Sequence, residues 1–257
     1  MGVIHGMANW RYHEQNGISS TAVKTVYKKS LAHWKGERRK SSAAFNLGNA
    51  VHALLLEEDK DLVIKGPKTK ASKAFKELEE SLKDDQVLLT EVEYNVAHRM
   101  ARSALIENKD CADMLRHKER VNEVSIFVKC PRTGLELKTR PDLMISSEGS
   151  VVDVKTTIDA SPRGFSKEVF KYSYDLQAAF YLYVCQLGGF DVKEFSFIAI
   201  EKSAPYVAHT HVVGPELMAN ATERMHHTLD IIANAEKEEN FSTGWGSYTL
   251  LELPKWL

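Results

Sequence analysis

This chain of 257 residues has little cysteine, and its cysteines lie far apart. Cys111, Cys130 and Cys185 form no CxxC pair, which argues against a disulfide framework, a zinc knuckle and an iron–sulfur cluster. Unpaired cysteines are typical of a reducing compartment, so we expect a cytoplasmic protein.

Long apolar runs and an excess of charge are also missing. No apolar run approaches the roughly 20 residues that span a membrane, and the first ten residues lack the pattern of a secretory signal. We therefore expect no contact with a membrane. The net charge is −1, so any attraction to nucleic acid must come from local basic patches. A hydrophobic content of 43% is ordinary for a globular protein with a buried core.

The pattern of secondary structure changes near residue 118. Before it, helices are predicted at 21–31, 43–56 and 91–115, with a shorter one preceding the last. After it, we expect strands at 121–130, 135–145 and 151–157, a helix at 172–187, strands at 194–201 and 206–213, and a final amphipathic helix. This order predicts one α/β domain over 1–257, with a mainly helical part at 1–118 and a sheet-containing part at 119–257.

The most informative segment is 140–155, Arg-Pro-Asp-Leu-Met-Ile-Ser-Ser-Glu-Gly-Ser-Val-Val-Asp-Val-Lys. Asp142 lies near the end of one expected strand, and Asp153 and Lys155 share a face of the next. Such a hairpin gathers two carboxylates and an ammonium, which suits a divalent cation and a water beside a phosphodiester. The alternative is a turn residue and a solvated cross-strand pair. The apolar run around Asp153 favours the cation site, because an unpartnered buried carboxylate is costly.

Two helices carry polar residues that would complete such a site. Gly48 precedes His52 by four residues and shares its helical face, so a backbone or a substrate can approach there; a packed or surface histidine is about as plausible. Tyr174, Gln177 and Tyr181 form a polar stripe on an otherwise apolar helix. This stripe is either a row of donors facing the site and a phosphate backbone, or an interface of amphipathic tyrosines.

Basic stretches and one helix start are the candidates for contact with DNA. The stretches at 28–40, which includes Arg38 and Arg39, and at 65–76 would give salt-sensitive contacts to phosphates, although a charge run is usually a solvated surface. Ser19 and Ser20, at a helix N-terminus, can hold a phosphate through backbone N–H groups. Arg140 can meet a phosphate or pair with a nearby carboxylate.

These residues, taken in order, resemble a known family. Gly48 with His52, Glu123, Arg140-Pro-Asp142, Asp153-Val-Lys155, and Tyr174-x-x-Gln177 with Tyr181 resemble the PD-(D/E)XK nuclease superfamily. More narrowly, the chain is similar to the RecE (exodeoxyribonuclease VIII) nuclease domain, which is related to lambda-type exonucleases. The resemblance runs from about residue 18 to 197, and Asp153 stands where many relatives carry Glu. It implies a restriction-endonuclease-like core with a mixed central β-sheet flanked by helices.

The resemblance also implies roles for individual residues. His52, Asp142, Asp153 and the Val154 carbonyl would bind Mg²⁺ or Mn²⁺, a ligand set of hard oxygens and one imidazole that suits these ions. Lys155 would position the attacking water and help to deprotonate it. Gln177 and Tyr181 would orient the water, Lys155 or the scissile phosphate. Glu123 is a candidate carboxylate beside the metal, and a solvated glutamate is nearly as plausible.

The implied activity is ATP-independent degradation of one strand of linear double-stranded DNA. Relatives of this kind work from the 5′ end and leave a 3′ overhang for a single-strand annealing protein of the RecT or beta type, in a bacterial or phage-infected cytoplasm. They form homo-oligomeric rings, so a trimer or tetramer is expected. Two alternatives stay open: a Cas4- or RecB-like nuclease or endonuclease, and a catalytically silent partner that binds DNA ends. The intact Asp142, Asp153 and Lys155 argue against the silent partner.

Overall fold

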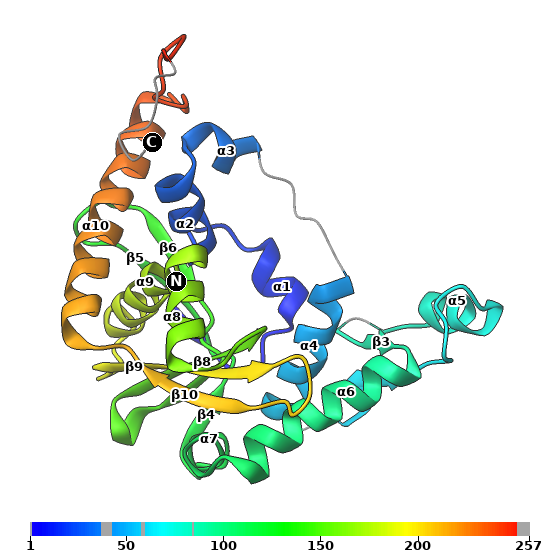
Figure 1. The fold of residues 1–257 in the computed structure, drawn as a ribbon. Coiled ribbons are helices and arrows are strands. Elements are labelled where there is room, and N and C mark those ends of the chain that lie inside the picture. The colour runs from blue at the N-terminus through cyan, green and yellow to red at the C-terminus, as the bar shows by residue number, and fades with distance from the viewer. Residues whose placement is uncertain (1, 37–42, 58–59, 84, 251–257) are drawn as a thin grey trace.

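The computed structural model describes residues 2–36, 43–57, 60–83 and 85–250 (Figure 1). Its central layer is a five-stranded sheet in the order β10-β9-β8-β7-β4. The strands are β4 (Arg120–Asn122), β7 (Leu143–Ile145), β8 (Ser150–Thr157), β9 (Glu194–Glu201) and β10 (Ala208–Val212). β8 and β9 are parallel and the other pairs are antiparallel, so the predicted mixed sheet is confirmed, with β8 at its middle.

A hydrophobic core covers each face of this sheet. One face packs against α2 (Ser20–Lys28), α8 (Pro162–Tyr172), α9 (Tyr174–Leu187) and α10 (Pro215–Glu238), and the other against α4 (Ala43–Leu56), α6 (Glu91–Arg102) and α7 (Lys109–Leu115). Alternation along β8 sends Val151 into the first core and Val152 and Val154 into the second. Asp153 and Lys155 therefore point toward α9, as their spacing predicts.

Smaller elements surround these layers, and several of them were not predicted. β1 (Gly2–Ile4), β5 (Ser125–Lys129) and β6 (Glu136–Thr139) form an antiparallel sheet, and β2 (Val63–Lys65) pairs in parallel with β3 (Val87–Leu89). The remaining helices are α1 (Asn9–Glu14), α3 (Leu31–Gly36) and α5 (Lys73–Glu80), and short helical turns cover Lys60–Leu62 and Ser146–Glu148. The loop expected at 65–76 therefore ends in α5. None of the described helices is both long and apolar enough to cross a membrane.

Both strands expected before β8 are divided by a local backbone feature. The strand predicted at 121–130 breaks at Glu123, whose φ of 49° bends the chain so that β4 and β5 join different sheets. The strand predicted at 135–145 breaks between β6 and β7, where Pro141 has no N–H to give to a sheet ladder. The two predicted strands were therefore too long. Strand-like residues continue in the sequence across both breaks, so the sequence pattern did not reveal them.

Predicted helices are divided in the same way. The one at 21–31 ends at Lys28, and α3 begins at Leu31. The one at 91–115 passes through a π-helical turn, Ser103–Glu107, and restarts after Asn108, whose side chain caps α7 by accepting from the Cys111 N–H at 2.9 Å. The helix predicted at 172–187 starts at Tyr174, after Ser173 at φ 51°. It is preceded by α8, whose Ser161-Pro162 start the sequence analysis missed.

Candidate metal centre

The β7–β8 hairpin brings Asp142, Asp153 and Lys155 together. The two strands are antiparallel with Leu143 opposite Val152, and Asp142 lies one residue before β7, not inside a strand as predicted. The Val154 N–H donates to Asp142 Oδ2 at 2.7 Å. The Lys155 ammonium forms an ion pair with Oδ2 of Asp153, which lies on the same face of β8. The main-chain bond thus joins Asp142 to the Asp-Val-Lys segment, and the ion pair joins the two charged residues of that segment.

Asp153 is almost completely enclosed, with 2% of its side chain exposed. Gln177 Nε2 on α9 donates to its Oδ1 at 2.7 Å, and Oδ2 accepts no hydrogen bond from the described residues beyond the Lys155 ion pair. Burial raises the pKa of Asp153, and the nearby charge of Asp142 adds to the effect, which Lys155 offsets only in part. A second cation at this carboxylate would therefore be stabilising.

Lys155 is held as an ammonium ion. Burial works to lower its pKa, but the charges of Asp153 and Asp142 outweigh burial and raise the pKa above its ordinary value. Its Nζ also lies 4.9 Å from the centre of the Tyr174 ring, which favours the charged form. In its charged form, Lys155 donates hydrogen bonds and has no lone pair to accept a proton.

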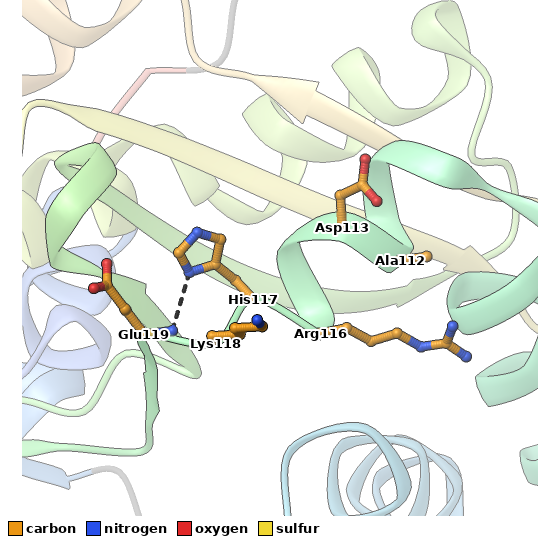
Figure 2. Close-up of a pocket in the computed structure, with 6 residues that line it drawn as sticks. All are labelled: Ala112, Asp113, Arg116, His117, Lys118 and Glu119. Carbon is orange, nitrogen blue, oxygen red and sulfur yellow. Dashed lines mark hydrogen bonds between the residues drawn. The ribbon is translucent and has the colours of Figure 1, made fainter.

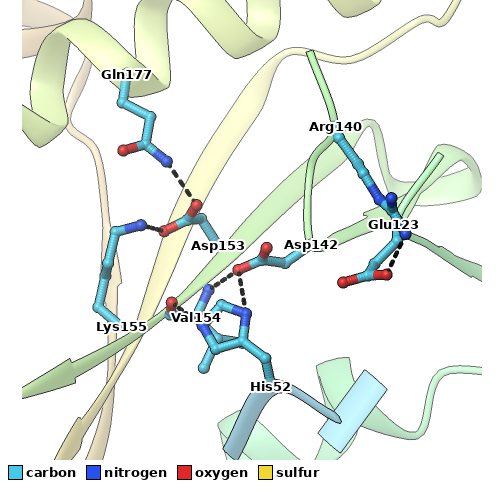
Figure 3. A network of polar contacts seen from close by, with 8 residues as sticks. All are labelled: His52, Glu123, Arg140, Asp142, Asp153, Val154, Lys155 and Gln177. Atoms are coloured by element: carbon cyan, nitrogen blue, oxygen red, sulfur yellow. Dashed lines mark hydrogen bonds and ion pairs between the residues drawn. The ribbon is translucent and has the colours of Figure 1, made fainter. Parts of the chain in front are cut away.

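His52 reaches the hairpin from α4, on the opposite side from Gln177 (Figure 3). Its Nε2 lies 2.8 Å from the Val154 carbonyl oxygen and its Nδ1 lies 3.5 Å from Asp142 Oδ2. Burial disfavours the charged ring, but Asp142 outweighs burial and raises the pKa of His52. In the same way, His52 lowers the pKa of Asp142 against the effect of burial. The Asp142 carboxylate at Nδ1 and the Val154 carbonyl at Nε2 hold the His52 ring in place beside the hairpin.

These donors fit a hard divalent cation. Two carboxylates, one main-chain carbonyl and one imidazole meet on neighbouring residues of β7, β8 and α4, the donor types that Mg²⁺ and Mn²⁺ accept. In the part of the chain that the structure describes, no three His, Cys, Asp or Glu side chains stand ready as a metal cluster. The His52 ring and the Lys155 ammonium instead contact the candidate ligand oxygens of Asp142, Asp153 and Val154.

Glu123 and Arg140 form a separate pair next to the centre. Glu123 does not lie inside the strand predicted at 121–130, because it sits at the bend between β4 and β5. Its N–H donates to the Asp142 carbonyl at 3.1 Å, and its carboxylate forms an ion pair with Arg140. The salt-bridge interpretation of Arg140 therefore describes this structure, and the pair buttresses the chain on either side of Asp142.

Glu57, directly after α4, is a site neighbour that the sequence analysis did not select. A hydrogen bond with Glu123 raises the pKa of Glu57 to about 7, with burial adding to the effect. The Glu57 carboxyl group therefore keeps its proton to a higher pH than an ordinary glutamate does. No local pattern predicts this contact, because it joins the end of a helix to a bend far along the chain.

The polar stripe of α9 faces α2 as well as the centre. Ser20 forms a side-chain hydrogen bond with Tyr181, and Lys24 Nζ on α2 donates to Gln177 Oε1 at 2.9 Å. Ser20 is buried and Ser19 is the N-cap residue of α2, without a side-chain capping bond. Lys24 was not predicted, although it follows Ser20 by one helical turn and so shares its face. Both interpretations of the stripe therefore describe part of the contacts, with Gln177 bridging α2 and Asp153.

The other candidates for DNA contact are only partly placed. Arg38 and Arg39 lie outside the described residues. In the stretch at 65–76, Lys65 and Lys70 form ion pairs of 2.9 and 2.8 Å with Glu91 and Glu93, at the start of α6. These two lysines are therefore partly neutralised by the chain itself, which weakens the prediction of a free basic loop.

A surface hollow lies away from these residues, at the end of α7 (Figure 2). The Glu119 N–H donates to His117 Nδ1 at 3.2 Å on its wall. It is lined by Ala112, Asp113, Arg116, His117, Lys118 and Glu119. None of these was predicted as a site residue. His117 Nε2 lies 3.4 Å from Glu148 Oε1 in the turn of the β7–β8 hairpin, at the opposite end of the strands from Asp142, so we assign the hollow no part in the centre.

Comparisons with known proteins identify the family and the fold of this chain. A family model described as a PDDEXK-like domain of unknown function (DUF3799) matches residues 20–251. No curated protein matches the chain. A crystal structure from Eubacterium rectale, described as a "putative exonuclease", aligns with a TM-score of 0.62 at 15% identity over 98% of this chain and 96% of that one. A phage related exonuclease from Haemophilus somnus 129PT covers 90% of this chain and 100% of its own, at 10% identity and a TM-score of 0.40. The first similarity shows a shared fold, and the second is too low to support an argument.

Proposed function

Because this chain belongs to the PDDEXK-like family DUF3799, we propose that it is a metal-dependent nuclease that hydrolyses the phosphodiester bonds of DNA. One observation carries the proposal: the β7–β8 hairpin buries Asp153 against Lys155, with Asp142, His52 and the Val154 carbonyl beside them. A buried ion pair alone needs none of these three additional groups. Together they form a cation site next to a fixed hydrogen-bond donor.

Each side chain has a distinct task in this proposal. Asp142, Asp153, the Val154 carbonyl and His52 hold Mg²⁺ or Mn²⁺, which supplies Lewis-acid activation of water and neutralises charge on the phosphate when bound. Lys155, kept protonated by both aspartates, donates to the incoming oxygen and stabilises the negative charge that grows in the transition state. Gln177 fixes the Asp153 carboxylate by donating to Oδ1, and so holds it toward the cation.

The preferred substrate is an end of linear double-stranded DNA. We propose that one strand is degraded, from its 5′ end, and that the remaining 3′ overhang passes to a single-strand annealing protein. A homo-oligomeric ring would keep the enzyme on its substrate and would concentrate local basic surface on a chain whose net charge is −1. An exonuclease is supported by the description of the E. rectale protein that shares this fold.

The test compares linear and covalently closed circular duplex DNA, each incubated with Mg²⁺, Mn²⁺ or EDTA. We expect metal-dependent loss of the linear substrate alone, and we expect Lys155→Ala to lower the rate at least about a hundredfold, because it removes a donor to the transition state. Labels at the 5′ and 3′ ends report which terminus is released first.

Two controls keep the result interpretable. Lys109→Ala removes an exposed lysine that pairs with Asp113 on α7, and should retain the wild-type rate. Circular dichroism of Lys155→Ala checks that the variant is folded. Nicking of closed circles would replace the exonuclease with an endonuclease, and binding to ends without any hydrolysis would identify a silent end-binding protein.

A further inference from the structure

Two lysines lie beside the ring of Tyr174, and only one of them has an anion. Lys155 Nζ is 4.9 Å from the ring centre and pairs with Asp153. Lys24 Nζ, arriving from α2, is 5.6 Å from the same centre and donates to the neutral amide oxygen of Gln177. Within the described residues, no carboxylate lies within ion-pairing distance of Lys24.

Lys138 shows how this protein holds a buried lysine for structural purposes. Its side chain is 8% exposed, and its ammonium donates to the carbonyl oxygens of Tyr12, His13 and Gln15. Three acceptors replace the hydration that a buried ammonium loses. Lys24, half-buried, has a single amide acceptor. The difference indicates that Lys24 is not satisfied by the folded chain alone.

The electrostatic surroundings of Lys24 favour an incoming anion. Burial, and then the charge of Lys155, lower the pKa of Lys24 to about 8, although Asp153 and Asp175 act in the opposite direction. An anionic oxygen beside the ammonium would restore its ordinary pKa and relieve the cost of burial. The missing partner therefore has the chemistry of a carboxylate or a phosphate oxygen.

We propose that Lys24 binds a phosphate of the DNA strand that lies in the nuclease centre. The inference rests on the proposed function and adds a binding residue to it. Gln177 separates Lys24 from Asp153, accepting from the first through Oε1 and donating to the second through Nε2. The phosphate on Lys24 is therefore a neighbour of the one that is hydrolysed. Its recognition is independent of base sequence.

The test measures binding without requiring hydrolysis. Fluorescence anisotropy of a labelled duplex end, with Ca²⁺ in place of Mg²⁺, gives the affinity of the wild type, Lys24→Met, Lys24→Arg and the control Lys109→Met. We expect Lys24→Met to weaken binding about tenfold, since a charge-assisted contact is lost. Its slope of log K against log salt should fall by about 0.7 to 0.9, one phosphate contact. Lys24→Arg should retain most of the affinity, and Lys109→Met should match the wild type.

Substrates that carry one neutral methylphosphonate linkage locate the contact. At one linkage near the end, the neutral methylphosphonate should weaken DNA binding by the wild type but leave the affinity of Lys24→Met unchanged. The substitution and the neutral linkage would then remove the same interaction. Additive losses at every linkage would overturn the proposal. So would a Lys24→Met variant with wild-type affinity and salt slope but a lower rate, which would make Lys24 a positioning residue for Gln177.

Folding and nuclease function are read out separately. A lower unfolding midpoint of Lys24→Met with unchanged DNA binding would assign Lys24 a structural role and overturn the proposal. If the wild type binds ends but hydrolyses no DNA in Mg²⁺ or Mn²⁺, the nuclease function fails while the methylphosphonate result still decides the role of Lys24.

Discussion

Asp153 at the centre of the sheet and Asp175 at the start of α9 are both buried carboxylates paired with one cation. Their side chains are 2% and 1% exposed, and their partners are Lys155 and Arg224. Around Asp175, the Arg224 guanidinium of α10 completes an ion pair that fastens two packed helices. Near Asp153, the His52 ring contacts both the Asp142 carboxylate and the Val154 carbonyl oxygen.

The two ion pairs differ in what surrounds them: Asp175–Arg224 is a structural pair, whereas Asp153–Lys155 belongs to the candidate metal centre. A pair that serves packing balances one charge with one charge, and nothing further is gained by adding acids to it. At Asp153 the second acid opposes ionisation and raises the pKa, which folding alone would not favour. Excess carboxylate in a buried position is therefore the feature that marks the centre, more than burial or ion pairing.

The largest expected effect comes from Asp153→Asn. The substitution keeps an acceptor for Gln177 but removes a metal ligand, so we expect the hydrolysis rate and the affinity for Mn²⁺ to fall at least about a hundredfold. Stability should fall less than in Asp175→Asn, because Asp142 still faces the Lys155 ammonium and the carboxylate that is removed was opposed by burial. Calorimetric titration with Mn²⁺ measures the metal affinity, and thermal unfolding in EDTA measures the stability without metal. A large loss of stability with normal metal affinity would make Asp153 a structural residue like Asp175.

Asp175→Asn should give the opposite result. It leaves the Arg224 guanidinium without its buried partner, and breaking such a pair costs about 3 kcal/mol of the free energy of unfolding. Specific activity below the unfolding transition should stay near that of the wild type. The matched control is Asp230→Asn, which breaks an exposed pair with Arg132 and should cost less than about 1 kcal/mol. Urea denaturation of the wild type, Asp175→Asn and Asp230→Asn gives the free energy of unfolding of each. Equal decreases for the two variants would show that the Asp175–Arg224 pair is no more important for stability than an exposed pair.

The smallest expected effect concerns Glu57, whose carboxyl group forms a hydrogen bond with Glu123. Its pKa is raised to about 7 by the hydrogen bond with Glu123, so the protonated form stabilises the fold. That contribution is complete at pH values below the ordinary pKa of Glu57 and is lost as the pH rises through about 7. Glu57→Gln keeps a donor and should remove this dependence.

Unfolding midpoints between pH 5 and 8 provide the measurement. The wild type should lose stability relative to Glu57→Gln as the pH rises, by a small amount because Glu57 is exposed to solvent. A constant difference between the two proteins over this range would show that folding does not raise the pKa of Glu57.

The nuclease hairpin could be predicted because its geometry is local. Two strands joined by a short turn fix which residues face each other, and alternation alone puts Asp153 and Lys155 on one face. The end of β4 at Glu123 and the separation of α8 from α9 at Ser173 could not be predicted from such local spacing. Glu123 and Ser173 are non-glycine residues with positive φ, a conformation that the surrounding packing imposes and that leaves no pattern in apolar spacing.

Short-range periodicity predicted the Pro-Asp and Asp-Val-Lys hairpin and the helices that carry His52 and Gln177, whereas the mixed sheet was predicted from the family resemblance. Three contacts are visible only in the folded chain: Gln177 links Asp153 to Lys24, Arg140 pairs with Glu123, and Glu57 forms a hydrogen bond with Glu123. These contacts join segments far apart in the chain. Their partners are chosen by how α2, α4 and α9 pack on the sheet, and their charges are set by the burial that this packing creates.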